Sequence, residues 1–151
     1  MTIPYDEFVG AFLSKISEYQ LLSLDEADRD AVVDGYLKKA LSNSTFRKVC
    51  PYDFVSGADD EIRTITIDID EAELEEIIDI VADGMICHWL KPYVYQQENL
   101  QNVMNTRDFT MYSPAELLLR VGNAYTKATK EYTQAIREYS YNHGDLSSLH
   151  L

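Results

Sequence analysis

The stretch MYSPAELLLRVGNAYTKATKEYTQAIREYSY, residues 111–141, decides the fold of this chain. It begins with the residues of a helix start, because Ser113 can cap the helix, Pro114 suits the first turn and Glu116 can reach back to the cap backbone. The spacing predicts a helix of roughly 28 residues that ends at Tyr141, about 42 Å long. Such a helix is longer than a compact domain of this size usually needs.

Along this helix, large and small residues alternate at steps of three and four, close to a heptad. The positions are Leu118, Val121, Tyr125, Ala128, Tyr132, Ala135 and Tyr139. We expect the part up to Tyr125 to join the core of the chain itself. For Tyr132 and Tyr139, either that core or a contact with a neighbouring subunit fits, because the other helices need not reach so far. All three tyrosines are therefore candidate interface residues.

The residues after the helix form a predicted C-terminal tail, 142–151, with Gly144 at the helix cap. This tail carries three leucines, Leu146, Leu149 and Leu151. It is either a frayed end or a short peptide that becomes ordered on a neighbouring protein. The domain division that follows is a single helical domain over 1–141 and the tail.

Three further helices are expected upstream. Residues 4–20 have apolar residues at helical spacing, and a second helix starts near Ser23 or Asp25 and runs to about Leu41. Its inward-facing residues are Val32, Val33, Tyr36, Leu37, Ala40 and Leu41. A third helix is capped by Asp70, with Glu73 completing a capping box, and Pro92 ends or kinks it. The fold class is thus mainly α, a bundle of about four helices with a long C-terminal helix.

One segment of the chain favours an extended conformation instead. Residues 46–62 are expected to be an irregular connection, and the stretch IRTITIDID, 62–70, then alternates branched residues in the manner of a strand. We predict one short strand or extended arm around 62–69, with Ile65 and Ile67 as candidate interface residues. The segment fits an ordered loop equally well, because no second strand is evident; as a strand, it would find its partner on another subunit.

Composition and charge restrict the class of partner. Hydrophobic residues make up 46% and charged residues 26% of the chain, which is ordinary for a globular domain, and no stretch is long and apolar enough for a membrane span. Residues 1–83 hold 20 Asp and Glu against 7 Lys and Arg, whereas residues 84–151 hold six of each. This acidic half repels phosphate, so nucleic-acid binding is disfavoured.

The start of the chain does not resemble a secretory signal, and two cysteines without a metal or redox spacing indicate synthesis in a reducing, intracellular compartment.

The sequence contains no motif that indicates catalysis. Phosphate-binding glycine loops, G-x-S-x-G, H-E-x-x-H and C-x-x-C are all missing. His88 lies beside Cys87, but neighbouring helical residues point in different directions, so we expect a structural histidine. The acidic run around residues 57–76 lacks the glycine and ligand spacing of a calcium loop. We therefore predict no enzyme, no catalytic residue, no metal and no cofactor.

The segment ADGMICHWLKPYVYQQENLQNVMNTRDFTMYSPAELLLRV, followed by an aromatic helix that ends in REYSYNHGDLSSL, resembles small structural proteins of tailed bacteriophages. With its length and helix order, the chain is similar to head–tail connector (adaptor) proteins, over residues 70–149 by motif and elsewhere by helix order alone. The resemblance implies a homo-oligomeric, commonly dodecameric, ring at the head–tail junction of the virion, made in the bacterial cytoplasm. It implies two protein partners, the portal and a stopper or tail protein.

The same resemblance implies that the C-terminal tail docks on the portal and that DNA passes through the ring without specific binding, with no membrane involved. The chain lacks the long glycine-rich loop that lines the channel in some relatives. Two other readings are an acidic helical module that binds a basic site on another protein, and an enzyme of unrecognised type with a pocket around His88.

Overall fold

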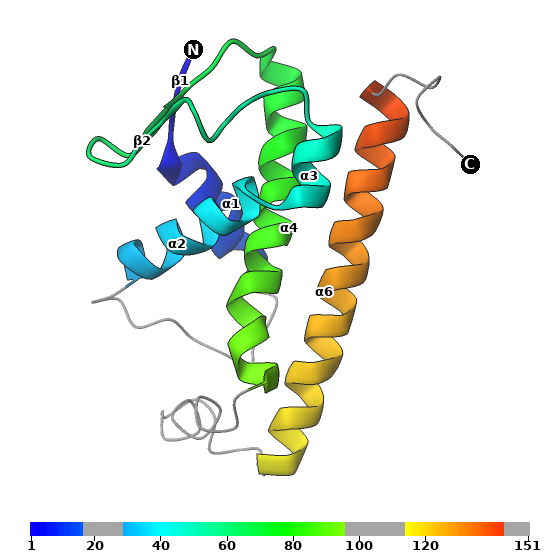
Figure 1. Ribbon diagram of the computed structural model, residues 1–151. Coiled ribbons are helices and arrows are strands. Elements are labelled where there is room, and N and C mark those ends of the chain that lie inside the picture. The colour runs from blue at the N-terminus through cyan, green and yellow to red at the C-terminus, as the bar shows by residue number, and fades with distance from the viewer. Residues whose placement is uncertain (17–28, 96–113, 144–151) are drawn as a thin grey trace.

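The computed structural model describes residues 1–16, 29–95 and 114–143, with the core on both sides of one central helix (Figure 1). The long helices α4 (Glu71–Tyr95) and α6 (Pro114–His143) lie side by side and run in opposite directions. On the other side of α4 lie α1 (Tyr5–Ile16) and α2 (Arg29–Leu41). The prediction of a mainly helical fold with a long C-terminal helix is confirmed.

Aromatic side chains join α1 to α2 and α4. The helix α1 buries Phe8, Val9 and Phe12, which recur at helical spacing. The Phe12 ring meets the ring of Trp89 edge to face, with centroids 6.0 Å apart, and that of Tyr36 at 6.1 Å. Trp89, in the C-terminal third of α4, is fully buried, so this cluster fixes how the two N-terminal helices pack on it.

The second helix ends at Leu41 as predicted, but a further helix follows it, so within the expected connection over 46–62 only residues 50–57 and 60–62 are irregular. The Asn43 side chain accepts hydrogen bonds from the backbone N–H groups of Thr45 and Phe46, and this cap starts the short helix α3 (Ser44–Val49). Phe46 is buried. Within α2, the prediction that Val32 faces inward is wrong, because this side chain is 40% exposed.

The predicted strand has its partners in the same chain. A three-stranded antiparallel sheet has the order β1-β3-β2, with β1 spanning Thr2–Pro4, β2 Ala58–Asp59 and β3 Thr64–Thr66. In its register Ile3 lies opposite Ile65, and Ala58 opposite the same residue from the other side. The expectation of a partner strand on another subunit is therefore wrong.

Charged side chains fasten the β2–β3 hairpin to the helices. Arg63, whose φ of 52° lies in the left-handed region, donates two hydrogen bonds to the Asp34 carboxylate and makes an ion pair with Asp6. The Tyr5 hydroxyl donates to Asp60 at 2.7 Å, and Lys38 binds the other oxygen of that carboxylate. Because the Asp34–Arg63 contact is bidentate, it holds this hairpin at a fixed angle to α2.

The helix α4 continues past Pro92 to Tyr95, so of the two expectations for this proline, an end or a kink of the helix, the first is wrong. At the other end, the backbone N–H of Leu74 donates to the Asp70 carbonyl, which places the helix start where Asp70 predicted it. The start expected for α2, at Ser23 or Asp25, lies outside the described residues.

Candidate functional site

The tyrosine row of α6 packs against α4. Tyr139 is 1% exposed and Tyr132 is 8% exposed, whereas Tyr125 is half-buried. The hypothesis that Tyr132 and Tyr139 meet a neighbouring subunit is therefore wrong, because helices of the same chain cover both side chains. Ile136, also buried, adds to this seam. Because Ile136 lies four residues after Tyr132, it falls on the same face of the helix, and this spacing could have predicted its burial.

Tyr132 packs against the only glycine in α4, Gly84. A Cβ atom there would lie 3.0 Å from Cζ of the ring and 3.2 Å from its hydroxyl oxygen, so the glycine makes room for the tyrosine. The Tyr132 hydroxyl has no hydrogen-bond partner in the described part of the chain. Burial raises its pKa, and the nearby Cys87 and Asp83 raise it further.

Tyr139 belongs to a second contact, which joins three segments. Its hydroxyl donates to Oε1 of Glu73 at 2.8 Å, and the hydroxyl of Tyr52 donates to Oε2 at 2.6 Å. The carboxylate thus connects the loop after α3, the start of α4 and the end of α6. The bond to Glu73 is the main reason that the pKa of Tyr52 rises to about 12, while burial is the main cause for Tyr139. The sequence indicated only a capping role for Glu73.

Removing one hydroxyl from each tyrosine is expected to have different effects. Tyr132→Phe deletes a buried hydroxyl without a described partner, so the free energy of unfolding should stay unchanged or rise by up to about 1 kcal/mol. Tyr139→Phe removes a hydrogen bond from the Glu73 carboxylate and should cost roughly 1–2 kcal/mol. Urea unfolding of both variants measures this difference. A larger loss for Tyr132→Phe than for Tyr139→Phe would contradict the assigned contacts.

The fold should lose stability in alkali, because four tyrosines of the described residues have raised pKa values. Their causes are burial for Tyr5, Tyr132 and Tyr139 and the Glu73 bond for Tyr52. In the unfolded chain these phenols ionise near pH ~10, whereas the folded chain keeps their protons. The unfolded state then binds fewer protons, so the free energy of unfolding falls as the pH rises above ~10.

The measurement is a pH titration that follows tyrosinate absorbance and helical circular dichroism together. We expect part of the absorbance to appear only as the helix signal is lost. Complete tyrosine ionisation with an intact helix signal would contradict this expectation.

The strand residues proposed as interface residues occupy different environments. Ile65 is fully buried between β1 and β2, so the prediction that it contacts another subunit is wrong. Ile67 is half-buried and packs against the same core. The large apolar side chain that does extend from this hairpin is Ile62, which is 67% exposed.

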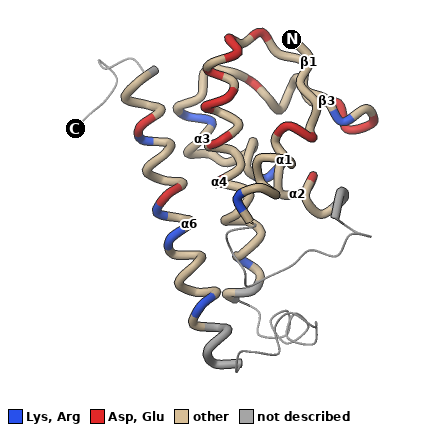
Figure 2. Tube along the Cα trace, turned by 180° about the vertical axis from the view of Figure 1, so that it is seen from behind, with Lys and Arg blue, Asp and Glu red and all other residues tan. Residues whose placement is uncertain are grey.

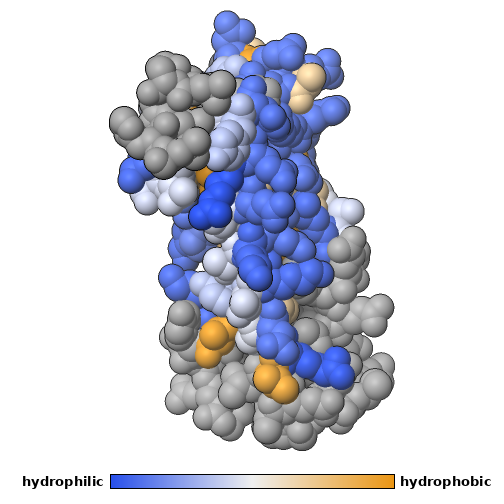
Figure 3. Space-filling view, turned by 90° about the vertical axis from the view of Figure 1, so that its right-hand side faces the viewer, coloured by the Kyte–Doolittle hydropathy of each residue, from blue (hydrophilic) through white to orange (hydrophobic). Residues whose placement is uncertain are grey.

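The outer face of α6 is mostly polar, with hydrophobic patches toward its N-terminal end, where Leu119 is 65% exposed (Figure 3). A shallow groove on this face is lined by Tyr125, three threonines (Thr126, Thr129 and Thr133), Lys130, Gln134 and Arg137. The hydroxyl of Thr126 donates to the Gly122 carbonyl at 3.0 Å, and that of Thr133 to the Thr129 carbonyl at 2.9 Å. Since both hydroxyls bond to the backbone of their own helix, these threonines leave their methyl groups for other contacts.

Acidic residues gather at the opposite side of the molecule. Asp and Glu are concentrated around the sheet and the adjoining part of α4, whereas α6 carries Lys and Arg interspersed with Glu131 and Glu138 (Figure 2). Between β1 and α4 runs a small groove whose rim carries three glutamates, Glu7, Glu71 and Glu75. The charge imbalance read from the sequence is therefore also a separation in space.

The described residues contain no group of three or more side chains that could hold a metal ion. His88 is half-buried, as expected of a structural histidine, and its pKa is lowered by burial and by Lys39 and Lys91. The Cys50 thiol is buried and Cys87 is half-buried, and burial raises the pKa of both. A raised pKa disfavours the reactive thiolate.

The candidate docking leucines of the tail, Leu146, Leu149 and Leu151, lie outside the described residues.

Taken together, the fold defines a helical domain with a buried α4–α6 seam and two polar surfaces of opposite charge. In comparisons with protein-family models, curated proteins and solved structures, no match was found. Within the described ranges, no helix has the length and hydropathy needed to cross a membrane.

Proposed function

We propose that this chain is a structural virion protein of a tailed phage, a ring-forming connector that joins the portal to the tail side. The observation that carries the proposal is the shape of α6, 30 residues long, which is buried along one stripe and exposes the opposite face. A helix of that kind presents a rigid, elongated surface to a neighbouring protein. The resemblance of residues 70–149 to phage connector proteins supplies the identity of the assembly.

The tyrosine row takes no part in the proposed assembly, since the chain covers Tyr132 and Tyr139 itself. It depends on surfaces that remain open after folding, and these are polar and charged. An acidic surface suits the wall of a DNA conduit, because it does not bind the passing phosphates. DNA would therefore pass without specific contacts, while the portal and a stopper or tail protein bind at the two ends of the ring.

The test is to measure the mass of the purified chain by light scattering, alone and mixed with the portal protein of the same phage. We expect a homo-oligomer that binds the portal, in a closed ring with a central opening visible by negative-stain electron microscopy. A chain that stays monomeric and leaves the portal unchanged would rule out the connector role.

A second candidate function is an acidic module that binds a basic site on another protein, without catalysis. The observation that favours it is the glutamate-lined groove, whose Glu71 and Glu75 make no ion pair with a described residue. Glu71→Gln and Glu75→Gln together should then abolish that binding and remove its salt dependence. Glu73 is unsuitable for this test, because it anchors Tyr52 and Tyr139.

A further inference from the structure

The groove between β1 and α4, here called the acidic groove, combines an apolar floor with a charged rim. Its floor is formed by Ile3, Leu74 and Ile78, of which the first two are buried and the third is half-buried. Its rim carries Glu7, Glu71 and Glu75, all exposed. A partner that fits must therefore bring small apolar groups flanked by positive charge.

The outer face of α6 has that chemistry. Lys130 and Arg137 are exposed, and seven residues of separation place them on the same side of the helix. They flank Thr133, whose hydroxyl is bound to the helix backbone and whose methyl group is free to make apolar contacts. Small side chains such as threonine also allow another backbone to approach closely. We call Thr126, Thr129, Lys130, Thr133 and Arg137 the α6 outer face.

These two surfaces point away from each other. The side of α4 that faces α6 is marked by Glu73, bonded to Tyr139, and by Gly84, packed against Tyr132. Glu71 and Glu75 are each two residues from Glu73, about 200° around the helix, and so project from the opposite side of α4. Figure 1 agrees, with β1 and α6 on opposite sides of α4. One molecule therefore cannot join its own two surfaces.

We propose that the acidic groove of one copy receives the α6 outer face of the next copy, with Glu71 and Glu75 close to Lys130 and Arg137. The inference rests on the proposed function, and it names the surfaces through which the ring forms. Contact between two different patches of identical chains is head to tail, and such contacts close into rings when the rotation between copies allows it. The separation of charge explains how a chain of net charge −13 associates with itself.

The test uses two charge-reversal variants of the full chain, studied by sedimentation velocity at about 0.15 M salt. Lys130→Glu/Arg137→Glu reverses the α6 outer face, and Glu71→Lys/Glu75→Lys reverses the rim of the acidic groove. All four side chains are exposed, and circular dichroism checks that both variants fold. We expect the wild type to form oligomers and each variant alone to associate at least tenfold more weakly.

Mixing the two variants should restore assembly. The reversed, now acidic, α6 outer face of the first variant then meets the reversed, now basic, groove of the second. The native α6 outer face of the second variant meets the native groove of the first, so the two chains would alternate. The matched control is Arg47→Glu/Lys48→Glu, which changes the charge by the same amount as the α6 variant at two exposed positions on α3. This control should assemble like the wild type.

Three results would overturn the interface: a wild type that remains monomeric, variants that assemble as the wild type does, or a mixture that stays dissociated. If oligomers form but ignore both reversals, the interface is wrong while the connector role stands. A groove that instead binds a basic partner, with self-association unaffected by the reversals, also overturns it. The connector role itself is decided separately, by the mixture with portal.

Discussion

Replacing Tyr139 with Ala is expected to lower the free energy of unfolding by roughly 3–5 kcal/mol, the largest effect in the α4–α6 seam. The side chain is 1% exposed, so its removal deletes buried aromatic surface and leaves a cavity between the helices. It also takes away the donor of a 2.8 Å hydrogen bond to Glu73. The better helix propensity of alanine recovers only a fraction of this loss.

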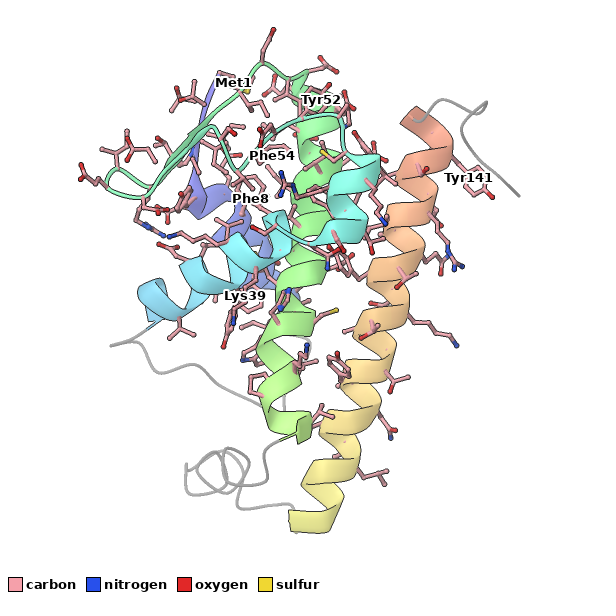
Figure 4. The ribbon with its side chains drawn as sticks, in the orientation of Figure 1. Met1, Phe8, Lys39, Tyr52, Phe54 and Tyr141 are labelled. Carbon is pink, nitrogen blue, oxygen red and sulfur yellow. The ribbon has the colours of Figure 1, made fainter. Side chains whose placement is uncertain are left out.

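The matched control is Tyr141→Ala, two residues further along the same helix. Tyr141 is 54% exposed and projects away from α4 (Figure 4). Its replacement should therefore change the free energy of unfolding by less than about 0.5 kcal/mol. The measurement is urea unfolding of the monomer, at a concentration where no oligomer forms. Equal effects of the two substitutions would contradict the packing assigned to α6.

Gly57→Ala is expected to cost about 3 kcal/mol, because the new methyl group would overlap the Thr66 carbonyl oxygen. The obstacle is backbone rather than a flexible side chain, and the Gly57 carbonyl accepts the backbone N–H of Thr66 at 2.9 Å. The chain can relieve the overlap only by moving β3 away from the segment before β2. That movement would weaken the sheet that covers the N-terminal end of the core.

Gly10→Ala provides the control of opposite sign. Gly10 lies in α1, and an added Cβ meets nothing within 4 Å. Alanine at such a site should stabilise the protein by roughly 0.5–1 kcal/mol through helix propensity. Thermal unfolding followed by circular dichroism separates the two cases. If Gly57→Ala were as harmless as Gly10→Ala, the close approach between Gly57 and β3 would be wrong.

The sequence predicted those parts of the fold that depend on long periodic segments. Residues 5–16, 71–95 and 114–143 are helical where the spacing of apolar residues indicated helices. Short elements escaped for a physical reason: β1 and β2 have three and two residues, too few to show alternation. The pairing of β1 with β3 joins residues that are about 60 positions apart in the sequence. No local sequence pattern reveals a contact over that separation.

The tyrosine row shows what periodicity alone cannot decide. A heptad-like stripe predicts that one face of a helix is buried, but the same stripe serves an internal seam and a contact between subunits. The difference lies on the partner helix, where Gly84 makes room for Tyr132 and Glu73 accepts the Tyr139 hydroxyl. The residues that neighbour Gly84 and Glu73 in the sequence do not indicate that these two contact tyrosines of α6.

The candidate interaction surfaces were only partly predictable. The sequence showed the excess of acidic residues in its first half, since charge can be counted directly. It did not show the acidic groove, because Glu7 and Glu75 meet there only after β1 folds beside α4. The sequence did not mark the α6 outer face for a related reason, because its threonines, Lys130 and Arg137 show no periodicity distinct from that of an ordinary solvated helix face.

The most direct test of the connector role is an electron-microscope image of tailed particles that carry a labelled copy of this chain. The role predicts that the label forms a ring at the junction between the head and the tail, with the same number of copies in every particle. Label on the capsid shell, on the tail tip, or on no particle at all would contradict it.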